Sequence, residues 1–308
     1  MKKVHAEMIW LLLICLILLD RGNGAQITAR ASWSNRLGAT LTPVATGVWA
    51  AERQFLWNGI DVGGRSVIAR MPKRPGEEIG KLFVHSPVEW TPELAIAIER
   101  LGGEVGACIA PNYEHLKFIE QWADRYPTAS TWACPGLPSR MPHVRWTNEF
   151  DDRDDNTPDG FERFWFDCEL NPFTGRPFFN EVVFFHKQSR ALLVTDVFWN
   201  YPDGPLPNYF GNSGTGSVHD CPKAPVDATT LPAVDVPVGT RAWKAGMDRI
   251  YLPFYKNLMV GRKGPRRERY NQLVEKLLGI GIELIVPCHG DVVRGADLCA
   301  DVLRKSLL

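Results

Sequence analysis

Three apolar segments lie far apart in the sequence, and each leads into a residue that can bind a metal ion. The segments are residues 105–109, 191–195 and 282–286, and the residues that follow them are His115, Asp196 and His289. Short apolar runs of this kind, alternating with helical patterns, are typical of buried strands in a layered α/β protein. Active sites of such proteins form where strands end. We therefore expect the three side chains to converge.

Imidazole and carboxylate groups together suit zinc, iron or manganese. The sequence thus predicts a site for one divalent metal ion at His115, Asp196 and His289. The alternative is that each histidine is an ordinary core or surface residue, which is the commoner case for a single histidine.

The first half of the chain has a β-α-β-α-β pattern between residues 82 and 133. Thr91, Pro92 and Glu93 predict a helix start, because Thr caps, Pro fits the first turn and Glu favours the positive end. This helix ends at Gly102-Gly103. The other expected elements are strands at residues 41–48, 63–68, 81–85, 105–109, 131–133, 161–166, 181–185, 191–196 and 282–286, and helices at 116–126, 241–256, 270–278 and 296–307.

Composition limits the classes of partner. Lys+Arg and Asp+Glu number 35 each, so the net charge is zero. A nucleic-acid-binding face needs clustered positive charge, so we expect no nucleic-acid partner. The hydrophobic share of 45% is enough for a buried core. The 11 tryptophans indicate half-buried rings around a cleft or an interface.

The first 25 residues resemble a signal peptide. Lys2 and Lys3 precede twelve apolar residues at 8–19, and small residues follow near Ala25. An uncleaved anchor is the alternative. Residues 26–40 form a linker or a second targeting segment, because they lack acidic residues and contain Arg and Ser. We therefore expect entry into the secretory pathway, with the protein secreted or in an organelle lumen. No membrane contact is expected beyond this leader.

Residues 41–308 are expected to form a single domain with a loop insertion at about 201–238. The insertion is rich in Pro, Gly, Ser and Asn, which fits either a lid over a site or a surface loop. Six cysteines lie outside the leader, and their strand contexts favour mostly free, buried thiols. His186, at a hairpin turn, is expected to be exposed.

Several stretches resemble the metallo-β-lactamase-like hydrolase fold, and more closely a family of unknown function on that fold, numbered forty-three thirty-six. They are LFVHSPVEWTPEL, IAPNYEHLKFIEQWADRYP, NEVVFFHKQSRALLVTDVFWN, GMDRIYLPFYKNLMV and VPCHGDVV. The resemblance covers nearly all of the chain after the leader. It implies an α/β fold, an αββα four-layer sandwich with a metal site at one edge of two sheets.

The superfamily motif His-x-His-x-Asp-His falls on Ala110, Asn112, Glu114 and His115, so two of its histidines are replaced. Asp196 matches the superfamily's bridging aspartate. His289, in Pro-Cys-His-Gly, matches its final histidine. The resemblance therefore implies one metal ion instead of two, held by His115, Asp196, His289 and Glu114.

The resemblance also implies roles for neighbouring residues. Glu181 lies near the position of the missing histidine, and either Glu181 or Glu114, where it is not a ligand, is a candidate general base. Asp196 is a candidate for both ligation and catalysis. His85 and Asn112 are expected to contact a ligand without binding the metal.

Two functions are compatible with these features. The first is a metal-dependent hydrolase of a small ester, thioester or amide. The second is a binding or scaffold protein that keeps the fold without catalysis. In both cases the expected partner is a small molecule.

Overall fold

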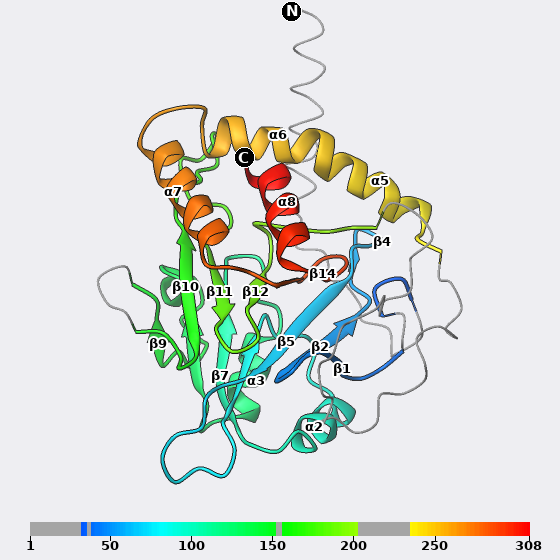
Figure 1. Cartoon of the computed structure of the whole chain (residues 1–308), viewed down its shortest axis with the longest axis vertical. Coiled ribbons are helices and arrows are strands. Elements are labelled where there is room, and N and C mark those ends of the chain that lie inside the picture. Colours follow the sequence, from blue (N-terminus) through cyan, green and yellow to red (C-terminus); the bar gives the residue numbers. More distant parts are fainter. Residues whose placement is uncertain (1–31, 36–37, 152–155, 203–234) are drawn as a thin grey trace, which may run out of the picture.

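The computed structural model describes residues 32–35, 38–151, 156–202 and 235–308. Two β-sheets face each other, and helices cover the outer face of each, which gives an α/β/β/α arrangement (Figure 1). The predicted leader and most of the predicted loop insertion lie outside the described residues. Among the described helices, none has the length and hydrophobicity needed to cross a lipid bilayer.

The first sheet has seven strands in the order β1-β2-β5-β6-β7-β8-β9. Its strands are β1 (Thr42–Ala45), β2 (Val48–Arg53), β5 (Gly64–Arg70), β6 (Leu82–His85), β7 (Val105–Ala110), β8 (Ser130–Ala133) and β9 (Asn148–Glu149). The strands from β6 to β9 are parallel neighbours. Their carboxyl ends therefore lie at one edge of the sheet.

The second sheet has five strands in the order β10-β11-β12-β13-β14. They are β10 (Phe161–Phe166), β11 (Glu181–His186), β12 (Ala191–Val194), β13 (Leu284–Pro287) and β14 (Val293–Arg294). Only β12 and β13 pair in parallel. A separate hairpin consists of β3 (Leu56–Trp57) and β4 (Ile60–Asp61).

The helices fall into two groups that pack on different sheets. The first is α2 (Pro92–Glu99), α3 (Ile119–Arg125) and α4 (Leu137–Arg140), whose buried residues join the core of the first sheet. The second is α5 (Val238–Gly246), α6 (Leu252–Phe254), α7 (Pro265–Gly279) and α8 (Ala296–Leu307), together with the π-helical turns η2 (Met247–Tyr251) and η3 (Tyr255–Met259). From Tyr251 onward, this group supplies buried residues that pack on the second sheet.

Strand alternation explains the four layers. In β11, Val182 and Phe184 join the core between the two sheets, whereas Val183 and Phe185 join the core beneath the outer helices. Successive side chains of a strand point to opposite faces. A strand that is apolar at every position must therefore be covered on both faces.

Most predicted elements are present within a few residues of the expected bounds. Thr91 caps α2, since its side chain accepts a hydrogen bond from the Leu94 amide. The single strand predicted at 41–48 is wrong, because β1 ends at Ala45 and Gly47, with φ of 71°, turns the chain into β2.

Two predictions concern individual residues of the core. The exposed position predicted for His186 is wrong, because its side chain is fully buried and its Nε2 contacts the Arg70 carbonyl at 3.0 Å. The free thiols are confirmed for Cys108, Cys134, Cys168, Cys288 and Cys299, whereas Cys221 lies outside the described residues.

Candidate active site

Strand register places Asp196 and His289 side by side. β12 and β13 run in parallel, and Val194 is the partner of Pro287. Asp196 and His289 each lie two residues beyond this pair. The Asn200 amide donates to the His289 carbonyl at 3.0 Å, which ties the two loops together.

His115 reaches the same point from the other sheet. It lies five residues beyond β7, in a turn that is joined to the second sheet by backbone hydrogen bonds. The Val182 amide donates to the Pro111 carbonyl at 2.8 Å, and the Tyr113 amide donates to the Phe179 carbonyl at 2.9 Å. The end of β7 is therefore held against β11.

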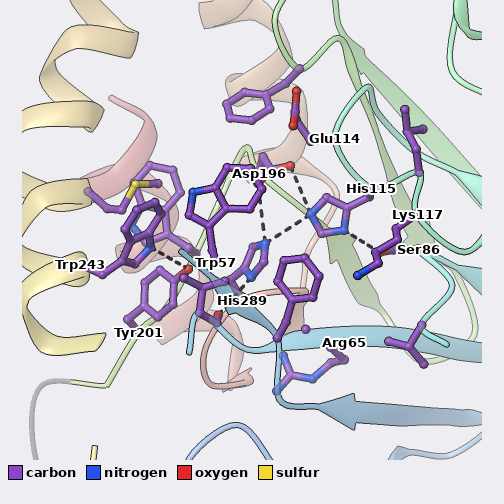
Figure 2. Close-up of a pocket in the computed structure, with 18 of the residues that line it drawn as sticks. Trp57, Arg65, Ser86, Glu114, His115, Lys117, Asp196, Tyr201, Trp243 and His289 are labelled. Carbon is purple, nitrogen blue, oxygen red and sulfur yellow. Dashed lines mark hydrogen bonds and ion pairs between the residues drawn. The ribbon is translucent and has the colours of Figure 1, made fainter. Parts of the chain in front are cut away.

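The three predicted ligands meet in space. Nε2 of His115 lies 3.3 Å from Nε2 of His289 and 3.3 Å from Oδ2 of Asp196 (Figure 2). Nε2 of His289 lies 3.8 Å from Oδ1 of Asp196. One ligand atom of each residue lies within 4.8 Å of the others. Residues separated by up to 174 positions thus share one site.

Hydrogen bonds at the other ring nitrogens orient both imidazoles. Nδ1 of His289 is 2.8 Å from the Gly63 carbonyl oxygen, which can only accept, so Nδ1 donates. The lone pair of His289 therefore lies on Nε2 and faces the cluster. Nδ1 of His115 is 2.7 Å from the Ser86 hydroxyl, which leaves Nε2 of His115 facing the same point.

These donors fit a single divalent metal ion. Ligand atoms at about 2.0–2.1 Å from a tetrahedral ion lie roughly 3.3–3.4 Å apart. Two of the observed separations are 3.3 Å, between Nε2 of His115 and Nε2 of His289 and between Nε2 of His115 and Oδ2 of Asp196. Two imidazole nitrogens and one carboxylate are also a donor set that zinc, iron and manganese accept.

Asn112 links the His115 turn to Asp196. Its Oδ1 accepts the backbone amides of Glu114 at 3.0 Å and His115 at 2.8 Å. Its Nδ2 donates to Thr195 Oγ1 at 2.9 Å and to Asp196 Oδ2 at 2.6 Å. Asn112 therefore contacts Asp196, one of the predicted ligands.

Glu181 lies behind Asp196, at the start of β11. Its carboxylate accepts the backbone amides of Thr195 at 2.6 Å, Asp196 at 2.7 Å and Val197 at 2.9 Å. The side chain is fully buried and does not line the pocket described below. This placement differs from that of a general base, which must reach the substrate. Glu181 instead holds the loop that carries Asp196.

Ser86 is a site residue that the sequence analysis missed. It follows β6 and has a φ of 51°, in the left-handed region that residues other than glycine rarely adopt. Such strained positions cluster at functional sites. The sequence signal was a small polar residue directly after an apolar strand, in Val84-His85-Ser86-Pro87.

Two predicted site residues lie elsewhere. Glu114 is exposed on the pocket wall and is not part of the ligand cluster (Figure 2). The expected contact between His85 and a ligand is wrong. Its ring is fully buried against Phe184, and neither ring nitrogen has a hydrogen-bond partner among the described residues.

Burial and charge pairing shift the pKa values in this region. Burial lowers the pKa of His115, but the adjacent Asp196 carboxylate outweighs it and raises the pKa well above its usual value. Burial and the charge on His115 lower the pKa of His289. Burial and the Asp196 carboxylate raise the pKa of Glu181 to about 7. Burial lowers the pKa of His85 to about 3, so this ring is neutral.

A pocket opens beside the three ligands. It has a cavity volume of about 160 Å³ and is lined mainly by aromatic side chains from the β3–β4 hairpin, the loops before β11 and after β12, and the α5–η2 helix. Figure 2 shows Trp57, Tyr201 and Trp243 near His289. The half-buried tryptophans expected around a cleft are thus represented by Trp57, Trp199 and Trp243.

Comparison with solved structures identifies the fold. Rubredoxin oxygen:oxidoreductase from the anaerobe Desulfovibrio gigas matches with a TM-score of 0.53 and 14% sequence identity, over 87% of this chain and 60% of that chain. A metallo-β-lactamase from Pontibacter korlensis matches with a TM-score of 0.48 and 12% identity, over 86% of this chain and 98% of that chain.

The metallo-β-lactamase FIM-1 from Pseudomonas aeruginosa, solved in a mono-zinc form, matches with a TM-score of 0.46 and 13% identity, over 87% of this chain and 96% of that chain. At these identities the likeness concerns the fold alone. The predicted α/β four-layer αββα sandwich is confirmed by the two facing sheets and their outer helices.

No curated protein matches this sequence. A family described as "Domain of unknown function (DUF4336)" matches residues 47–209, which is more than half of the 308 residues and includes His115 and Asp196. The chain therefore belongs to the DUF4336 family.

Proposed function

We propose that this protein is a metal-dependent hydrolase of a small carbonyl substrate, an ester, thioester or amide. One divalent ion would be held by His115, Asp196 and His289. The observation that carries the proposal is the convergence of their ligand atoms beside a pocket of substrate size. Such sites, concave and mostly apolar with a few convergent polar groups, are typical of small-molecule enzymes.

A divalent ion at this position supplies two effects when bound. It would polarise a carbonyl oxygen and lower the pKa of a coordinated water to about 7. A single ion supports attack on a carbonyl group. It does not provide the paired clamp on attacking and leaving oxygens that two-metal enzymes use for phosphodiesters.

The protein's own residues prepare the site. The Gly63 carbonyl and the Ser86 hydroxyl fix the two imidazole rings. Asn112 and the backbone of the Glu181-bound loop fix Asp196. Asp196 supplies the carboxylate of the ligand cluster, and it lines the pocket. It is therefore placed to accept a proton from an attacking water.

The aromatic walls exclude water from the reacting groups. The side chains of His115, Asp196 and His289 are only 14%, 15% and 14% exposed, respectively. Electrostatic interactions are stronger in such a low-dielectric environment. Substrate entry would remove more of the remaining water.

Metal content is the decisive measurement. Protein purified after expression with zinc, iron and manganese in the medium should contain about one equivalent of one of these metals. The variants His115→Ala, Asp196→Ala and His289→Ala should lose it. His143→Ala is the matched control, because His143 is an exposed histidine outside the site.

Hydrolysis of small esters and thioesters should disappear with a chelator and return when metal is added back. Wild-type protein that holds no more metal than His115→Ala would contradict the metal site. A full equivalent of metal without hydrolysis of any ester, thioester or amide would support the alternative, a non-catalytic binding or scaffold protein. The replacement of two histidine positions by Ala110 and Asn112 is the observation that favours this alternative.

A further inference from the structure

The pocket beside the ligand cluster has walls of aromatic rings contributed by separate parts of the chain. Trp57 comes from β3, Phe179 from the loop before β11, Trp199 from the loop after β12, and Trp243 and Tyr251 from the α5–η2 helix. Rings from four segments therefore surround one space. Stacked and edge-to-face contacts with such rings favour a flat apolar ligand.

The size of the cavity fits one aromatic ring. Its volume is about 160 Å³. An apolar cavity of about 150 Å³ in a protein core is known to bind benzene. A six-membered ring with a short substituent directed toward His115, Asp196 and His289 would fill the space. A fused polycyclic group would not fit without movement of the walls.

The polar groups of the walls are mostly engaged with one another. The indole N–H of Trp199 donates to Asp248 at 3.0 Å, and that of Trp243 donates to the Tyr201 hydroxyl at 3.1 Å. The indole N–H of Trp57 is buried and has no hydrogen-bond partner among the described residues. A buried donor of this kind is costly unless a ligand supplies an acceptor.

The cationic side chains at the pocket also interact with other groups of the protein. Arg65 is buried, pairs with Glu52 at 2.6 Å and donates to the Pro287 carbonyl. The Lys117 ammonium lies 5.6 Å from the ring centroid of Phe55 and 5.3 Å from that of Phe118. Among the described residues that line the pocket, no cluster of cations is placed to bind a phosphorylated or polyanionic ligand.

The ring-binding wall continues to the ligand cluster. The Tyr201 ring lies nearly parallel to the His289 ring, at an interplanar angle of 23° and a centroid distance of 6.2 Å. A ring bound in the pocket would therefore lie next to the reacting centre, with its substituent directed toward His115 and Asp196.

The geometry points to an uncharged aryl or arylalkyl carbonyl compound as the substrate, such as a phenylacetyl ester or thioester. The inference rests on the proposed function, which supplies the reaction, hydrolysis of the carbonyl compound. The ring is bound among Trp57, Trp199 and Trp243. The scissile carbonyl group faces the metal ligands.

Binding can be tested separately from hydrolysis, with the full chain and tryptophan fluorescence as the readout. Phenylacetamide, an uncharged probe, should change the fluorescence and saturate with an affinity at least about tenfold higher than that of acetamide. Trp243→Leu and Trp57→Phe should each weaken phenylacetamide binding by about threefold or more. Trp146→Phe is the control, because Trp146 packs on the core outside the pocket and donates to the Met141 carbonyl.

Hydrolysis is then compared for S-methyl phenylthioacetate and S-methyl thioacetate, by the thiol released from metal-loaded protein. The inference expects kcat/KM at least about tenfold higher for the phenyl compound. Hydrolysis of both thioesters at equal rates, with no binding of phenylacetamide, would overturn the inference and leave the proposed function intact. Binding of phenylacetamide without hydrolysis of either thioester would support the ring-binding pocket and count against the proposed function.

Discussion

Asn112 provides the sharpest test of how the site is held together. It is fully buried, accepts two backbone amides and donates to Thr195 Oγ1 and to the Asp196 carboxylate, the latter at 2.6 Å. Asn112→Leu keeps the branched shape of the side chain and removes these bonds. A net loss of about 1 kcal/mol for each of the three neutral bonds and about 1.5–3 kcal/mol for the bond to the carboxylate gives a destabilisation of roughly 4–6 kcal/mol.

The same change should weaken metal binding. Residues that orient metal ligands typically contribute about 10–100-fold to metal affinity. Asn112 orients both the His115 turn and Asp196, so we expect a loss in this range. Urea unfolding of the metal-free protein measures the first effect, and competition with a chromophoric chelator measures the second.

Two further variants make the result interpretable. Asn112→Asp keeps the acceptor for the amides of Glu114 and His115 but places a second buried carboxyl group beside the Asp196 carboxylate, so at neutral pH it should be at least as destabilising as Asn112→Leu. Asn148→Ala, at the far edge of the first sheet, should be nearly neutral. An unfolding free energy within about 0.5 kcal/mol of wild type for Asn112→Leu, with unchanged metal affinity, would refute the reasoning.

Other parts of the structure give further predictions. Ser86→Ala should lower metal affinity about tenfold with little change in unfolding free energy, because it removes only the partner of His115 Nδ1. Equal affinity in a chelator competition would contradict that role. Glu181→Gln should lower the unfolding free energy by about 1–3 kcal/mol, because an amide cannot accept three backbone N–H groups as the carboxylate does. A urea midpoint like that of wild type would show that the loop does not need the carboxylate. His85→Leu should raise the unfolding free energy by about 1 kcal/mol, because a buried ring without a partner is replaced by an apolar side chain. A decrease would mean that the ring has a role in the fold. Burial lowers the pKa of His186, so its stabilising contribution is complete above the unfolded pKa of about 6.5 and is lost as the pH falls below it. In urea titrations at pH 7.5 and 5.5, His186→Gln should therefore lose less stability on acidification than wild type does.

The sequence predicted the layers and the convergence of the ligands because both follow from local patterns. Apolar runs at β7, β12 and β13 end before His115, Asp196 and His289, and parallel strands bring their ends to one edge. The bounds of individual elements were less accurate, as with the β1–β2 hairpin, where a single glycine turns an apolar run into two strands.

The roles of neighbouring residues could not be predicted in the same way. Ser86 and His85 are adjacent at the end of β6, yet only Ser86 contacts His115, because the chain turns out of the strand at Ser86, whose φ is 51°. Glu181 contacts backbone amides 14–16 residues away, after a hairpin whose register the sequence does not state. Such contacts depend on side-chain directions that only the folded chain defines.

Asn112 has a structural role between the two sheets. A buried polar side chain without hydrogen-bond partners would cost stability. Asn112 instead uses both of its N–H groups and accepts two backbone amides. It connects the His115 turn to Asp196, which follows β12 of the facing sheet. A fully satisfied buried network of this kind holds His115 and Asp196 in one geometry, and the 3.3 Å between their ligand atoms is the spacing expected for two ligands of one metal ion.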